Sequence, residues 1–150
     1  MPTSPRWRGT LELADGTVLA FDFGTRRIGV ALGESLLGSA RPLTTIDAEA
    51  NEARFAAIDR LIKEWQPTRL VVGLPLSLAG EEHEMSARCR RFARQLEGRF
   101  NLPVTLTDER LSSVEAEERL SARGQDWKTR RKTLDAEAAA IILQSYFDAK

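Results

Sequence analysis

Three carboxylates occupy positions where an acidic side chain is unusual. Asp22 interrupts an otherwise apolar run, Glu109 follows the last run typical of a strand, and Asp135 opens a helical pattern near the end of the chain. A buried carboxylate is costly unless it finds a hydrogen bond, a cation or a metal ion. Each acid also has a simpler structural interpretation, as a strand-end, junction or helix-start residue. If the last helix packs on adjacent strands, all three acids converge on one site.

The residue types in this set determine which chemistry such a site can do. The chain has one histidine, His83, and one cysteine, Cys89, which cannot supply a structural zinc site. A site made of carboxylate oxygens alone suits Mg²⁺ or Mn²⁺. Two such ions about 3.5 to 4 Å apart can activate water and stabilise the leaving oxygen of a phosphodiester. The acidic set therefore predicts metal-dependent phosphodiester hydrolysis.

Polar and basic residues lie close in sequence to each of the three acids. Candidate contacts to nucleic acid are Thr25, Arg26, Arg27, Arg110, Lys128, Arg130, Arg131 and Lys132. Arginine forms bidentate bonds to phosphate, and such contacts would surround the site with positive charge. Surface ion pairs, or a solvated loop at 125–132, are the simpler interpretation. Gly24 and Gly73 either let the backbone approach metal or phosphate, or serve ordinary turn geometry.

The length and composition of the chain bear on its domain number, its partners and its location. With 150 residues, of which 42% are hydrophobic, the chain has enough material for one domain and too little for two. We expect an N-terminal extension at 1–16 and a single domain at 17–150. Twenty-two basic residues balance 22 acidic ones, so overall charge does not identify a polyanion partner. Without a long apolar run or signal-peptide pattern, a cytoplasmic protein with no membrane segment is expected.

Periodicity predicts the elements that must position the site. Strands are expected at 18–23, 28–32 and 43–46, forming an antiparallel meander, and then at 70–73 and 102–108. Helices are expected at 47–65, with Asp47 as its cap, at 85–101, at 112–123 and at 134–149. The order is three strands, then helix, strand, helix, strand and two helices. An apolar strand such as 70–73 is typical of a parallel sheet covered on both faces.

Four segments of the chain resemble motifs of one known family. Residues 21–31 are similar to D-x-G-T-[KR]-R-I-G-x-A, and residues 71–76 contain V-V-G-L-P. Residues 107–116 are similar to D-E-R-x-[ST]-[ST]-x-E-A, and residues 135–146 to D-x-x-A-A-x-x-I-L-Q-x-Y. Together, and in this order, they resemble the YqgF family, also called RuvX or Holliday-junction-resolvase-like proteins. The resemblance extends from about residue 19 to nearly the end of the chain.

The resemblance implies both a fold and a function. The fold is a ribonuclease H-like α/β domain, in which helices flank a mixed sheet made of an antiparallel meander and parallel strands. Carried over residue by residue, the catalytic and metal-binding trio is Asp22, Glu109 and Asp135. The implied activity is trimming of the 5′ end of precursor 16S ribosomal RNA during ribosome biogenesis. The departures from the family pattern are the N-terminal extension and the Glu137-Ala138 pair.

Other functions remain open at this point. Resolution of four-way DNA junctions uses the same chemistry but needs two sites, and so predicts a homodimer. A nucleotide clamp like that of actin or Hsp70 is another reading of the Asp22 motif, although such clamps use two domains. A non-catalytic module associated with RNA or transcription would keep the fold without needing the acids. No residue pattern selects RNA over DNA, a monomer over a dimer, or one metal over two.

Overall fold

The computed structural model describes residues 16–75, 83–108 and 127–149, and only the backbone of 127–132. The strands are β1 (Thr17–Phe23), β2 (Arg27–Glu34), β3 (Ser39–Asp47), β4 (Arg69–Leu74) and β5 (Val104–Asp108). The helices are α2 (Asn51–Trp65), α3 (Glu84–Phe100) and α5 (Trp127–Asp148). The expected helix at 112–123, and the expected extension up to residue 15, lie outside the described residues.

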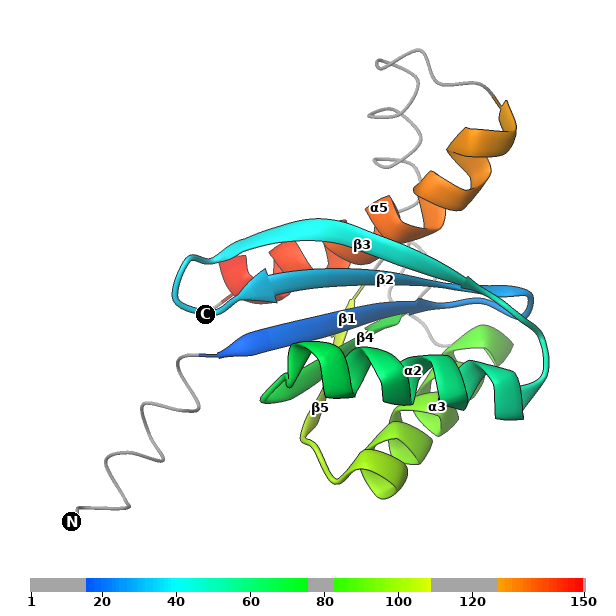
Figure 1. Ribbon diagram of the computed structural model, residues 1–150, viewed down its shortest axis with the longest axis horizontal. Coiled ribbons are helices and arrows are strands. Elements are labelled where there is room, and N and C mark those ends of the chain that lie inside the picture. The colour runs from blue at the N-terminus through cyan, green and yellow to red at the C-terminus, as the bar shows by residue number, and fades with distance from the viewer. Residues whose placement is uncertain (1–15, 76–82, 109–126, 150) are drawn as a thin grey trace.

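The strands form one mixed sheet in the order β3-β2-β1-β4-β5 (Figure 1). β1, β2 and β3 pair antiparallel, as the meander predicted, whereas β4 pairs parallel to both β1 and β5. Because β1, β4 and β5 run in the same direction, their carboxyl ends meet at one edge of the sheet, called here the carboxyl edge. This confirms the predicted combination of a meander and parallel strands.

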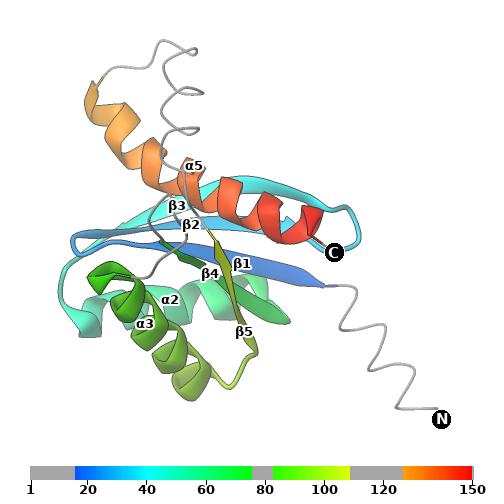
Figure 2. The same ribbon diagram turned by 180° about the vertical axis from the view of Figure 1, so that it is seen from behind.

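The sheet is covered on both faces, with α2 and α3 on one side and α5 on the other (Figures 1 and 2). Successive side chains of a strand point to opposite faces. Along β1, Leu19 and Phe21 join the core beneath α2 and α3, whereas Val18 and Ala20 join the core beneath α5. No described helix has the length and apolar character needed to cross a membrane.

Small residues on β2 allow α5 to lie very close to the sheet. Gly29 and Gly33 fall on the same face of β2, and Ala31 between them packs in the core beneath α5. A Cβ atom added at Gly29 would lie 1.8 Å from the carbonyl oxygen of Asp135. One added at Gly33 would lie 2.7 Å from the Phe147 ring. The close packing of α5 therefore depends on glycine at positions 29 and 33 of β2.

Two predicted boundaries around β3 were wrong. β3 is nine residues long and begins at Ser39, because its pairing with β2 continues where exposed side chains hide the strand pattern. Asp47 is the last residue of β3, opposite Arg27, and does not cap the next helix. α2 begins at Asn51, with Ala50 as an N-cap that makes no side-chain bond.

The last helix also begins earlier than predicted. α5 starts at Trp127, so residues 127–132, expected in a basic loop, are helical. Lysine and arginine are good helix formers and can extend a helix beyond its apolar stripe. Asp135 therefore lies well inside α5 and not in its first turn. The explanation of Asp135 as an acid favoured by the helix N-terminus, which acts only within the first turn, is excluded.

Candidate active site

Asp22 lies one residue before the end of β1, at the carboxyl edge. It is half-buried between the buried Phe21 and the half-buried Phe23. By strand alternation it shares a face with Val18 and Ala20, which pack beneath α5. In the antiparallel ladder it stands directly opposite Gly29 of β2. Asp22 therefore faces the side of the sheet that α5 covers.

Asp135 reaches the same place from the other end of the sequence. Its carbonyl oxygen lies against Gly29, at the point where α5 crosses β2. Because residues directly opposite in a ladder point to the same face, Gly29 links the two acids. Asp22 and Asp135 thus lie on one face and at one end of the sheet. Tertiary packing therefore places two of the three predicted ligands next to Gly29.

Arg27 makes an ion pair with Asp135. Its Nε donates to Oδ2 of Asp135 across 2.6 Å, and the two side chains are 25% and 22% exposed. Arg27 is predicted from its sequence position to contact nucleic acid, whereas its Nε is engaged by the carboxylate. Thr25 and Arg26, in the turn between β1 and β2, are exposed, and their predicted role in substrate binding stays a prediction.

Glu109 and its neighbour Arg110 lie outside the described residues. β5, which precedes them, ends at Asp108 opposite Leu74 of β4, and so reaches the carboxyl edge. Among the residues that the structure describes, no cluster of three acids, histidines or cysteines is placed to hold a metal. The structure places Asp22 and Asp135 at the carboxyl edge, and the roles of all three acids as metal ligands stay predictions.

The two glycines proposed for backbone approach differ in their surroundings. A Cβ added at Gly24 would lie 2.6 Å from the carbonyl oxygen of Arg27, so the tight turn itself requires a glycine there. Gly73 is buried within β4, opposite Thr107 of β5. Turn geometry accounts for Gly24, and the approach of metal or phosphate to either glycine remains a prediction.

Arg54 is not among the residues predicted from the sequence, and its side chain is almost fully buried, at 3% exposed. Its Nη2 donates to the Gly24 carbonyl oxygen at 2.6 Å and its Nε to the Ala48 carbonyl oxygen at 2.5 Å. Burial lowers the pKa of its guanidinium, and nearby Glu49 partly opposes this change. The available signal was helical spacing, because Arg54 lies four residues before the buried Ile58.

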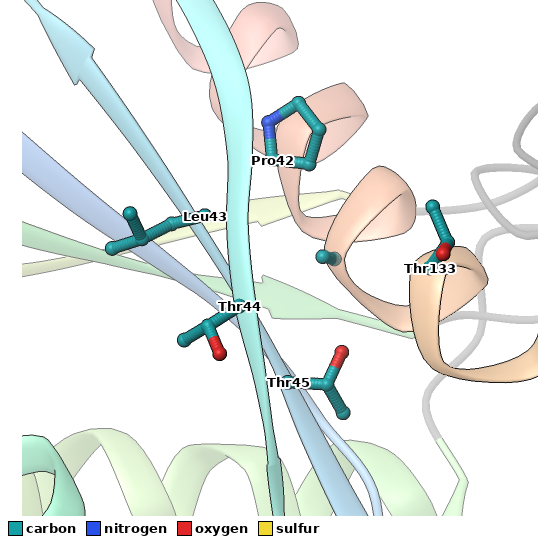
Figure 3. A pocket seen from close by; sticks show the side chains of 6 residues that line it. Pro42, Leu43, Thr44, Thr45 and Thr133 are labelled. Carbon is teal, nitrogen blue, oxygen red and sulfur yellow. The ribbon is translucent and has the colours of Figure 1, made fainter. Parts of the chain in front are cut away.

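An open groove of about 480 Å³ lies between β3 and α5 (Figure 3). It is lined by Pro42, Leu43, Thr44, Thr45, Thr133 and Ala136. Thr45 points from β3 toward α5 and is the ladder partner of Gly29. The groove therefore reaches the part of α5 next to Asp135 in sequence, and hydroxyl groups are among its lining. Lys128, Arg130, Arg131 and Lys132 belong to the same helix, but their side chains are outside the described part.

This sheet, covered by helices on both faces and carrying acids at its carboxyl edge, defines a ribonuclease H-like domain. Two solved structures of Thermus thermophilus RuvC, the second in complex with a Holliday junction substrate, share the fold with TM-scores of 0.51 and 0.53. Both are 16% identical to this chain and cover 89% of it, and the match includes 95% and 94% of their own chains. The chain belongs to the RuvX family, described as Holliday junction resolvase, whose model matches residues 16–149.

Proteins with high sequence identity carry a common name, "Putative pre-16S rRNA nuclease". The protein of Methylobacillus flagellatus is 63% identical over 133 residues, which cover 89% of this chain and 91% of that protein. The protein of Dechloromonas aromatica is 57% identical, with 89% and 92% covered. The protein of Salmonella typhimurium is 50% identical, with 89% and 96% covered.

Proposed function

We propose that this chain is a divalent-metal-dependent nuclease that hydrolyses phosphodiester bonds in precursor 16S ribosomal RNA. Its catalytic and metal-binding residues are Asp22, Glu109 and Asp135. The names of its relatives and its family membership support the reaction class. One structural observation supports the site more than any other: Asp22 and the backbone of Asp135, far apart in sequence, both adjoin Gly29 at the carboxyl edge.

The donor atoms at this edge fit Mg²⁺ or Mn²⁺. Asp22 and Asp135 both offer carboxylate oxygens, which these hard ions prefer. No sulfur and no imidazole nitrogen belongs to this pair of acids. Buried Cys89 belongs to the core beneath α2 and α3, and His83 caps α3. A bound divalent ion would supply activation of water and stabilisation of the leaving oxygen. Arg27 meanwhile holds the Asp135 carboxylate in place.

The groove between β3 and α5 supports a nucleic-acid substrate. Thr45 and Thr133 line this groove and carry hydroxyl groups of the kind that contact phosphate and ribose. The basic residues between 128 and 132 lie on the helix that forms one wall of the groove. In this proposal the RNA backbone follows the groove toward Asp135, while Thr25, Arg26 and Arg110 contact phosphates near the cut.

The decisive experiment incubates purified protein with precursor 16S RNA and Mg²⁺ or Mn²⁺. The variants Asp22→Asn, Glu109→Gln and Asp135→Asn should keep the fold, by circular dichroism, and lose at least about 100-fold in cutting rate. Asp59→Asn is a matched control, because Asp59 pairs with Lys63 on the outer surface of α2. The proposal is wrong if the three variants cut as fast as the control.

Four-way DNA junctions are the second candidate substrate. The description of the family and the likeness to RuvC in complex with a junction favour it. Symmetric cutting of a junction needs two sites, so this alternative predicts a stable two-fold dimer. Sedimentation analysis, combined with parallel assays on junctions and precursor RNA, would separate the two. If the protein is a dimer that cuts only junctions, its substrate is branched DNA and not RNA. The proposed catalytic residues would stay the same.

A further inference from the structure

Arg54 is the one buried cation in residues 16–75, 83–108 and 133–149. Burying a guanidinium is unfavourable unless hydrogen bonds replace its contacts with water. Arg54 meets that requirement through main-chain carbonyl oxygens, without an ion pair at 4 Å or closer within the described part of the chain. Because burying a guanidinium costs free energy, the position of Arg54 suggests a role other than general stability.

The contacts of Arg54 connect the start of α2 with the end of β1, the turn that follows it and the loop after β3. Nη2 donates to the carbonyl oxygen of Gly24, in the turn that follows β1. Nε donates to the carbonyl oxygen of Ala48, in the loop between β3 and α2. The guanidinium carbon lies 5.3 Å from the centre of the Phe23 ring, in a cation–π arrangement. The turn after β1 is thereby tied to the start of α2.

This turn is the backbone on which the proposed chemistry depends. Gly24 lies two residues after Asp22, and the exposed Thr25 and Arg26 complete the turn. β1 ends at Phe23 and β2 begins at Arg27, so the ladder does not hold the residues between them. The bond from Arg54 to the Gly24 carbonyl supplies a constraint there from the opposite face of the sheet.

We infer that Arg54 is a positioning residue, whose forked bonds to Gly24 and Ala48 hold the turn after β1 and so orient Asp22 for catalysis. The inference rests on the proposed function for the role of Asp22. It acts through the backbone, because Arg54 lies on the α2 side of the sheet whereas Asp22 faces α5. A displacement of about 1 Å in a catalytic group can cost about 100-fold in rate, so a loosened turn should affect turnover.

A matched control is available at the other end of the sheet. Arg69 in β4 is half-buried, and its Nη1 donates to Oγ1 of Thr105 at 2.7 Å. It is the ladder partner of Val18, at the opposite end of β1 from Asp22. Arg69→Met removes a hydrogen-bonded, partly buried guanidinium, as Arg54→Met does, but far from the acids. The pair separates positioning from general stability.

The test compares Arg54→Met, Arg54→Lys and Arg69→Met in the full chain, at a temperature where each is fully folded by circular dichroism. Three quantities are measured: ¹⁵N order parameters of residues 24–26, the Mn²⁺ dissociation constant by electron paramagnetic resonance, and kcat and KM on precursor RNA. In Arg54→Met we expect order parameters to fall from about 0.85 to below about 0.6. We expect Mn²⁺ affinity to fall about 10-fold and kcat about 10- to 100-fold, with little change in KM. Arg69→Met should match the wild type in all three.

Arg54→Lys keeps the positive charge but lacks the planar fork, so it should give an intermediate loss. The inference is overturned if Arg54→Lys equals the wild type, if the turn stays ordered in Arg54→Met, or if Arg69→Met loses as much activity. It is also overturned if the order parameters of the turn fall in Arg54→Met while Mn²⁺ affinity and kcat stay at their wild-type values. A wild type that binds no Mn²⁺ and cuts no RNA would refute the proposed function instead, and the order parameters alone would then decide whether Arg54 holds the turn.

Discussion

Arg27 at the start of β2 and Asp135 in α5 form an ion pair 2.6 Å long, although they are 108 positions apart in the sequence. The bond joins the carboxyl edge of the sheet to the helix that covers one of its faces. Together with the close approach of the Asp135 backbone to Gly29, it holds a proposed metal ligand against the strand next to β1. Two sequence motifs, at residues 21–31 and 135–146, thus depend on one small area of packing.

The energy of this ion pair can be measured by a double-mutant cycle with Arg27→Gln and Asp135→Asn. Both side chains are about one quarter exposed, so water screens the pair and the coupling should be about 0.5 to 1 kcal/mol. Urea unfolding of the wild type, both single variants and the double variant gives this value. It should decrease in 1 M salt because ions screen the attraction. Strictly additive effects would mean that the pair does not form in solution.

Replacing Gly29 by alanine should separate α5 from the sheet. The added methyl group would meet the main chain of Asp135, which cannot move aside as a flexible side chain can. We expect a loss of about 3 kcal/mol or more in the free energy of unfolding, at the upper end for overpacking. Gly98→Ala is the control, because Gly98 lies in α3 with open space around it and should gain up to about 1 kcal/mol. Equal stability of the two variants would refute the close packing.

Binding of a divalent metal ion to the folded state should raise the free energy of unfolding. A free Mn²⁺ concentration 100-fold above the dissociation constant adds about 2.7 kcal/mol if only the folded state binds. Differential scanning calorimetry should therefore show a higher Tm with Mn²⁺, and a chelator should reverse it. Asp22→Asn should remove most of the rise, whereas Asp59→Asn should keep it. A Tm that does not respond to metal in the wild type would contradict the proposed site.

Ser86 should be needed to join the V-V-G-L-P segment to α3. Its buried hydroxyl donates to the carbonyl oxygen of Pro75 and accepts from the backbone nitrogen of His83 at 3.0 Å. Ser86→Ala leaves both backbone groups short of a partner, which should cost about 1 to 3 kcal/mol. Ser145→Ala, at an exposed position on α5, should change stability by less than about 0.5 kcal/mol. Thermal or urea unfolding of both variants provides the comparison.

The local pattern of apolar residues was sufficient to predict the strands and helices that have a buried side. The apolar runs around Phe21, Val30 and Val72 mark strands, and the spacing of Phe55, Ile58 and Leu61 marks α2. The pattern was insufficient where exposed residues continue an element. β3 extends to Ser39 through pairing with β2, and α5 extends back to Trp127 through charged residues, so neither boundary has an apolar signature.

The sequence by itself determined the fold class, the family and the candidate acids, because residue types and their periodicity are local properties of the chain. Only the tertiary structure decided which residues meet: that the Asp135 backbone lies against Gly29, that Asp135 takes Arg27 as its partner, and that Arg54 reaches Gly24. These contacts depend on strand register and on how closely a helix approaches the sheet. Both are set by packing between segments distant in sequence, for which no single segment carries a signal.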